Sequence, residues 1–213
     1  MSTRRFTSAT ALAALVATAM LAGAAGPASG AAKVTCSTKG TTIAAGTGAR
    51  VFIVKSGATR RVYGCSTSAR KLRTLGRAEG EGVVAKTLTV NGPRVAYALR
   101  ACGETGCQQS VLVRDLKTGK SVSAALSAPG DVEQEVSDIL LSRTGTVAWI
   151  AEERSEAGAA TARYVSSRKP GAFTGIPVVP HATGLDIAAG SLALAGNTLY
   201  WTQGAVPRAA AIG

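Results

Sequence analysis

The sequence of 213 residues is poor in the side chains that most catalytic centres use, and it contains a single histidine. One imidazole excludes metal centres that need several histidines and weakens any scheme in which a histidine activates a serine. The chain also lacks a G-x-S-x-G elbow, a phosphate-binding loop, a dinucleotide fingerprint and an H-E-x-x-H motif. These absences favour a binding or scaffold protein over an enzyme, and we expect no metal or other cofactor.

Residues 1–32 have the pattern of a secretory signal peptide. Residues 1–5 form a short basic segment, residues 9–23 are apolar and uncharged, and the small residues at 28–32 supply two cleavage sites. A membrane anchor is the alternative, but the apolar run is short and rich in alanine for a spanning helix. We therefore expect a secreted bacterial protein whose mature domain is residues 33–213, without a stable membrane anchor after cleavage.

The formal net charge of +12 is unevenly distributed. Residues 33–120 contain 16 basic and 4 acidic side chains, whereas residues 121–213 contain 6 and 8. Such asymmetry can mark an anionic partner, although a charged surface also keeps a secreted protein soluble. The predicted binding patch comprises Arg60, Arg61, Arg70, Lys71, Arg73 and Arg77.

A basic patch on outer strands has a second interpretation, because charged edges prevent sheets from pairing with one another. The sequence does not separate this protective role from binding. Nucleic acid is not an expected partner, since the protein is exported and the patch lacks interleaved aromatic residues.

Four cysteines in an exported chain can pair in three ways. Cys102 and Cys107 enclose Gly-Glu-Thr-Gly, a turn composition that can bring two hairpin arms to disulfide distance. By elimination, we expect the other disulfide between Cys36 and Cys65. A zinc site is the alternative, but the close paired spacings of structural zinc sites are absent.

After residue 32 the sequence has short apolar or alternating runs separated by Gly, Asn, Pro or Ser, a pattern typical of an all-β fold. The expected strands are 50–55, 61–66, 87–90, 94–100, 110–115, 139–142, 146–151, 191–195 and 198–202.

Apolar residues recur within these runs at intervals of 52 residues, in the sets Leu88, Leu140 and Leu192; Val95, Val147 and Leu199; and Tyr97, Trp149 and Trp201. An earlier unit lies 44 residues upstream and matches Val51 to Val95 and Ile53 to Tyr97. This period predicts a β-propeller-like array, with a β-sandwich as the alternative. We expect the three large aromatic residues to pack in the core rather than to form a sugar-stacking surface.

The second unit carries the most specific motif. The segment Asn91-Gly92-Pro93-Arg94-Val95-Ala96-Tyr97 resembles the D-G-x-x-I-A-Y core of TolB-type propeller repeats, with Asn91 in place of the usual Asp. Residues 111–120 resemble the D-L-x-T-G-K end of a blade, and residues 145–149 and 196–201 repeat the first element. The resemblance covers most of residues 40–204 and implies a fold far more than a function. The Gly-His and Trp-Asp dipeptides of WD repeats are absent.

The mature chain has room for about four blades. The fourth unit has space after Thr202 for only one more strand. Residues 33–38 could supply the missing outer strand and close the ring, which the Cys36–Cys65 disulfide would then lock. Otherwise the array is open.

Two acidic clusters are candidate sites for carboxylate chemistry: Asp131, Glu133, Glu135 and Asp138; and Glu152, Glu153 and Glu156. Clusters this dense are more often solvated loops, and their spacing matches no EF-type calcium loop. His181 lies in a proline-rich, loop-like stretch, where we expect it to be exposed or structurally hydrogen-bonded.

The sequence therefore predicts a secreted, non-catalytic module that binds a protein or an anionic envelope polymer. The alternative is a small propeller hydrolase or lyase that uses Asp and Glu carboxylates. An enzyme needs at least two titratable groups that converge on one pocket with displaced pKa values, whereas a binding module needs only a coherent charged or aromatic face.

Overall fold

The protein is described by a computed structural model that covers residues 34–104, 106–125, 133–155, 157–170 and 178–212. The predicted signal peptide, Asp131 and Glu156 lie outside these residues. All fifteen elements of the described chain are strands, so the fold is all-β there. No described segment forms a helix long and apolar enough to cross a membrane.

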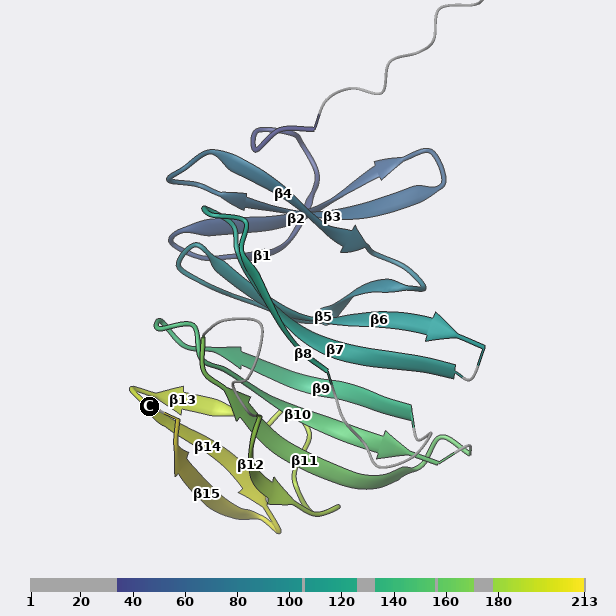
Figure 1. Cartoon of the computed structure of the whole chain (residues 1–213), viewed down its shortest axis with the longest axis vertical. Coiled ribbons are helices and arrows are strands. Elements are labelled where there is room, and N and C mark those ends of the chain that lie inside the picture. Colours follow the sequence, from purple (N-terminus) through teal and green to yellow (C-terminus); the bar gives the residue numbers. More distant parts are fainter. Residues whose placement is uncertain (1–33, 105, 126–132, 156, 171–177, 213) are drawn as a thin grey trace, which may run out of the picture. The chain divides into compact units, whose positions relative to one another are not determined.

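The strands form four antiparallel sheets that follow the chain order (Figure 1). The first sheet contains β1 (Thr41–Ala45), β2 (Ala49–Ser56), β3 (Thr59–Ser66) and β4 (Lys71–Arg77). The second contains β5 (Gly82–Asn91), β6 (Arg94–Gly103), β7 (Gly106–Asp115) and β8 (Ser121–Ala125). The third contains β9 (Glu133–Leu141), β10 (Val147–Arg154), β11 (Ala160–Arg168) and β12 (Val179–Thr183). The last contains β13 (Ala193–Ala195), β14 (Thr198–Gln203) and β15 (Val206–Ala211).

Successive sheets pack face to face through three apolar clusters. Val62 and Tyr97 belong to the cluster between the first and second sheets, Trp149 to the next, and Trp201 to the cluster between the third and fourth sheets. Tyr97, Trp149 and Trp201 are only 1%, 2% and 6% exposed, which confirms their predicted place in the core. Four sheets also exceed the two of a β-sandwich, the alternative fold.

Polar contacts connect neighbouring sheets as well. The Asn91 side-chain amide donates to the carbonyl oxygen of Leu141 at 2.9 Å, a bond that a carboxylate at this position could not donate. The buried Gln109 carbonyl accepts from the backbone N–H of Val136, and the Asp138 carboxylate accepts from that of Leu192.

The predicted match of the first unit to the second is wrong by one residue. Val51 and Ile53 pack toward the second sheet, whereas Tyr97 packs toward the sheet that precedes its own. Phe52 of the first sheet faces away from the sheet that follows it, as Tyr97 does in the second sheet. The turn before β2 has three residues and the turn before β6 has two, and a one-residue slip exchanges the two faces of a strand.

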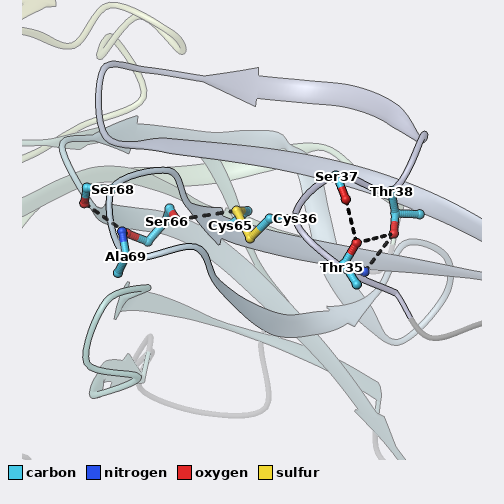
Figure 2. The surroundings of a disulfide bond; sticks show 8 residues. All are labelled: Thr35, Cys36, Ser37, Thr38, Cys65, Ser66, Ser68 and Ala69. Carbon is cyan, nitrogen blue, oxygen red and sulfur yellow. Dashed lines mark hydrogen bonds between the residues drawn. A yellow bond between two sulfur atoms is a disulfide. The ribbon is translucent and has the colours of Figure 1, made fainter.

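Of the two alternatives for the ends of the array, the closing strand at residues 33–38 is not formed by the described residues 34–38. Residues 34–38 form a turn in which the Thr38 N–H donates to the carbonyl of Thr35 and the Thr35, Ser37 and Thr38 hydroxyls bond one another. This turn satisfies its backbone locally, and Cys36 joins it to the buried Cys65 of β3 within the first sheet (Figure 2). The last sheet contains three strands in the described chain.

Both predicted disulfides are present, and all four cysteines take part in them. Cys102 and Cys107 lie directly opposite each other in the β6–β7 hairpin. Two disulfides are typical of proteins outside the cytoplasm.

Candidate functional site

The six residues of the predicted patch lie on β3, β4 and the turn between them, but at two ends of that hairpin. Arg61 lies opposite Arg77 at one end. Arg70 and Lys71 lie at the other end, where Lys71 faces Ser66, five residues along β3 from Arg61. At about 3.3 Å per residue the two ends are roughly 17 Å apart.

Two members of the patch already have protein partners. Arg60 forms an ion pair with Glu79 at 2.7 Å, on the surface. Arg73 is half-buried and packs against Gly119 in the β7–β8 turn, so closely that an added Cβ would lie 3.0 Å from the guanidinium carbon. Arg61, Arg70, Lys71 and Arg77 are exposed.

The structure adds an aromatic component that the sequence reading missed. The outer face of the first sheet, which points away from the second, carries Arg50, Phe52, Arg61, Tyr63 and Arg77. The Phe52 and Tyr63 rings stack at 5.9 Å between centroids, and the Arg50 guanidinium lies 4.5 Å from the Phe52 centroid. The expectation that no aromatic residue accompanies the basic patch is therefore wrong for this face. The sequence could have revealed this face, because residues two apart on a strand, such as Arg61 and Tyr63, point to the same side of the sheet.

The first sheet has an extreme charge composition. Residues 34–77 contain no Asp or Glu, and eight basic residues lie between Thr41 and Arg77. Like charges on neighbouring strands, such as Arg61 and Arg77, repel each other when no anion lies between them.

A second basic feature is a cavity of about 240 Å³ between the second and third sheets. Its apolar wall contains Val111, Val113 and Val147. Among the described residues, its basic side chains are those of Arg94, Lys120, Arg168 and Lys169, and its carboxylate is that of Asp115. None of these residues was predicted as a site, because they come from four separate segments of the chain.

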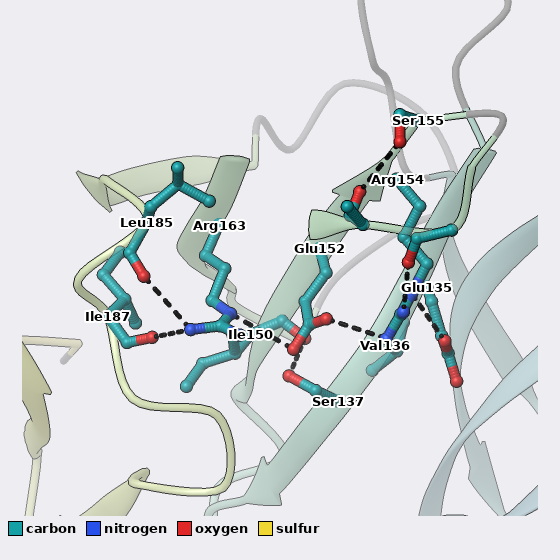
Figure 3. Close-up of polar contacts among 12 residues, drawn as sticks. Glu135, Val136, Ser137, Ile150, Glu152, Arg154, Ser155, Arg163, Leu185 and Ile187 are labelled. Atoms are coloured by element: carbon teal, nitrogen blue, oxygen red, sulfur yellow. Dashed lines mark hydrogen bonds and ion pairs between the residues drawn. The ribbon is translucent and has the colours of Figure 1, made fainter. Parts of the chain in front are cut away.

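The acidic residues of the third sheet are held in an ion-pair network (Figure 3). The buried Glu152 carboxylate accepts from Arg154 at 3.0 Å and from Arg163 at 3.2 Å. Arg163 also donates to the carbonyl oxygens of Leu185 and Ile187, which lie on the connection to the last sheet. The described residues of the second predicted cluster, Glu152 and Glu153, therefore lie on β10 and not in a solvated loop.

Glu135 lies opposite Glu152 and extends the network. It binds Lys86 at 2.5 Å and Arg154 at 3.0 Å, and the hydrogen bond from Lys86 holds the pKa of Glu135 below its usual value. Burial raises the pKa of Asp138. Neither Glu135 nor Asp138 lines the cavity, so these two displaced pKa values do not converge on it.

His181 lies on the edge strand β12 and not in the predicted loop, since Pro180 is tolerated where a strand has only one neighbour. Its Nε2 lies 2.8 Å from the Ser167 hydroxyl, as expected for a structurally bonded histidine. Burial lowers its pKa. Ser167 is only 4% exposed, so substrate has little access to this hydroxyl.

No three His, Cys, Asp or Glu side chains within the described ranges are grouped as a metal site would require. No family model, curated protein or solved structure matches the chain. The residues themselves therefore carry the functional argument.

Proposed function

We propose that this protein is an exported, non-catalytic binding module of a bacterial cell envelope, and that its first sheet binds an anionic envelope polymer. We also propose that the four sheets are blades of an open, TolB-like propeller array. The face-to-face order of the sheets and the shared core positions of Tyr97, Trp149 and Trp201 support this fold assignment.

Export is supported by the two disulfides, which persist in oxidising compartments. The signal-peptide pattern of residues 1–32 supports the same location.

The observation that carries the binding proposal is the first sheet with eight basic side chains and no acidic one. Arg61, Arg70, Lys71 and Arg77 are exposed at the two ends of one hairpin, a separation that suits an extended polymer better than a small ion. A polyanion would relieve the repulsion between opposite arginines and release counterions on binding.

A binding role is better supported than carboxylate catalysis. The carboxylates of Glu135 and Glu152 accept bonds from arginine and lysine side chains. Among the described residues that line the cavity, Asp115 supplies the one carboxylate, whereas a pair of carboxylates is needed for glycoside hydrolysis.

The test is a pull-down of the mature protein on a purified anionic wall polymer at low and high salt. The triple variant Arg61→Gln, Arg70→Gln, Lys71→Gln should bind several-fold more weakly and with a shallower salt dependence. The control variant Lys117→Gln, Arg143→Gln, Arg208→Gln removes the same charge from exposed positions outside the first sheet and should bind almost normally. Equal losses in both variants, or salt-insensitive binding, would refute the proposal.

A further inference from the structure

We propose that the cavity between the second and third sheets binds a small organic anion, with one carboxylate or phosphate group on an apolar body. The volume of about 240 Å³ is below the range of drug-sized pockets and suits a body of about six to ten non-hydrogen atoms. This site is separate from the outer face of the first sheet and does not rest on the polymer proposal.

The cavity lies where the ends of two hairpins meet. Arg94 begins β6 and lies opposite Asp115 at the end of β7, and Val147 begins β10 opposite Arg168 at the end of β11. Val111 and Val147 belong to the apolar cluster between these sheets, and Val113 packs against it. The cavity wall is thus an open end of the core, which suits the apolar part of a ligand.

The carboxylate of Asp115, which lines the cavity, has partners within the protein. Asp115 lies 3.9 Å from the Arg94 guanidinium and accepts a hydrogen bond from the Thr118 N–H at 2.8 Å. Arg94 is held in place because it also donates to the carbonyl of Arg143 at 3.0 Å. Two further cations, those of Lys120 and Lys169, are exposed at the cavity and add to its positive charge.

The basic side chains around the cavity distinguish it from a packing defect. Empty cavities in proteins are apolar, whereas four basic side chains line this one. Lys120 and Lys169 are exposed and come from different sheets, so both can turn toward one anionic group at the entrance. A cation of the same size would be repelled.

The first experiment uses three probes with one hydrocarbon body: hexanoate, hexan-1-ol and hexylammonium. Each is titrated into the mature, disulfide-bonded protein at low salt and followed by amide NMR shifts. Hexanoate should bind saturably and shift amides of β6, β7, β10 and the β7–β8 turn, hexan-1-ol should bind more weakly, and hexylammonium should not bind. Absence of saturable hexanoate binding, or equal binding of all three probes, would overturn the proposal.

The second experiment compares lysines that line the cavity with a lysine that does not. Lys120→Gln combined with Lys169→Gln should weaken hexanoate binding about 5- to 10-fold and leave hexan-1-ol unchanged. Lys120→Gln alone should also weaken hexanoate binding, and Lys117→Gln is its matched control, because Lys117 is exposed in the same turn but does not line the cavity. An unchanged affinity in the double variant, or an equal loss in the control, would overturn the proposal. Because all three substitutions are at the surface, the fold is retained and the comparison is decisive.

Discussion

Between Thr41 and Arg77 the first sheet carries eight basic side chains and no acidic one, whereas residues 133–183 of the third sheet carry five basic and six acidic ones. In the third sheet the buried Glu152 joins two arginines in one network. In the described part of the first sheet, the recorded ion pair is Arg60–Glu79, at the surface. The third sheet therefore uses its charges internally, and the first sheet leaves them to solvent or to a ligand.

The two sheets are held by different means as a consequence. A sheet of one charge gains no ion pairs within itself and pays for like-charge repulsion. The first sheet has instead the Cys36–Cys65 disulfide and its apolar contact with the second sheet. This covalent bond lets the sheet tolerate a charge composition of one sign.

The largest effect should come from removing that disulfide. Cys36→Ala combined with Cys65→Ala should lower the free energy of unfolding by about 3–4 kcal/mol, because the bond closes a loop with a sequence separation of 29. The Cys102–Cys107 bond closes a loop with a sequence separation of only 5. Cys102→Ala combined with Cys107→Ala should therefore lower the free energy of unfolding by about 2 kcal/mol. Denaturant unfolding followed by circular dichroism measures both. A larger loss in the β6–β7 hairpin would contradict the role assigned to Cys36–Cys65.

A second prediction concerns the buried carboxylate of the third sheet. Glu152→Gln should destabilise the protein by about 2–3 kcal/mol, somewhat less than a fully buried pair, because both arginine partners are partly exposed. Glu79→Gln, which removes the exposed partner of Arg60, should change stability by less than about 0.5 kcal/mol. Denaturant unfolding measures the free energy of unfolding of both variants. Similar losses would contradict the view that the third sheet depends on its ion pairs and the first does not.

A third prediction concerns pH, since the only imidazole of the chain lies in the third sheet. Because burial lowers the pKa of His181, the folded state favours the neutral ring. This contribution is present above the ordinary pKa of about 6.5 and is lost as the pH falls through the lowered value. The wild-type protein should therefore lose stability relative to His181→Gln as the pH falls below about 6.5. Fluorescence of Trp149 and Trp201 reports the unfolding, and parallel pH profiles would rule the effect out.

The all-β fold, both disulfides and the core aromatics were predictable because each leaves a local signal: alternation, a turn between cysteines, or recurrent large side chains. All nine expected segments overlap strands, and β15 is the one further strand expected after Thr202, whereas β1, β4, β8, β11 and β12 were not anticipated. Edge strands such as β4 and β12 are half-solvated and need no apolar alternation, so their sequences resemble loops.

The errors have a common origin in contacts between distant segments. The sequence repeat aligned Ile53 with Tyr97, and only the sheet packing reveals that Phe52 is the residue in the equivalent orientation. The cavity draws Arg94, Lys120 and Arg168 from separate strands and turns, and no spacing in the sequence brings them together. The pairing of Glu152 with Arg163 likewise depends on the register of β10 and β11.

The smallest predicted effect connects stability and binding at one residue of the first sheet. Arg70 has φ of 50°, a left-handed conformation that costs about 1–2 kcal/mol for a residue with a Cβ, whereas glycine adopts it freely. Glycine also lowers the free energy of unfolding by about 0.5–1 kcal/mol, because it increases the entropy of the unfolded chain. The net effect of Arg70→Gly should be a stabilisation of about 0.5 kcal/mol. The same change removes an exposed charge and should weaken polyanion binding with a shallower salt dependence.

Arg70→Gln separates these two effects, because glutamine carries no charge but keeps a side chain for which the left-handed conformation is costly. It should weaken polymer binding as much as Arg70→Gly does. Ala205→Gly is the converse control: Ala205 has φ of 61° in the β14–β15 turn, so glycine there should give a similar small gain in stability without changing binding. If Arg70→Gly stabilises the protein and binding is unchanged, this arginine has no part in recognition, and the unbalanced charge of the first sheet serves solubility at that end of the hairpin. If both stability and affinity change as expected, the first sheet retains a strained arginine for the charge that it presents.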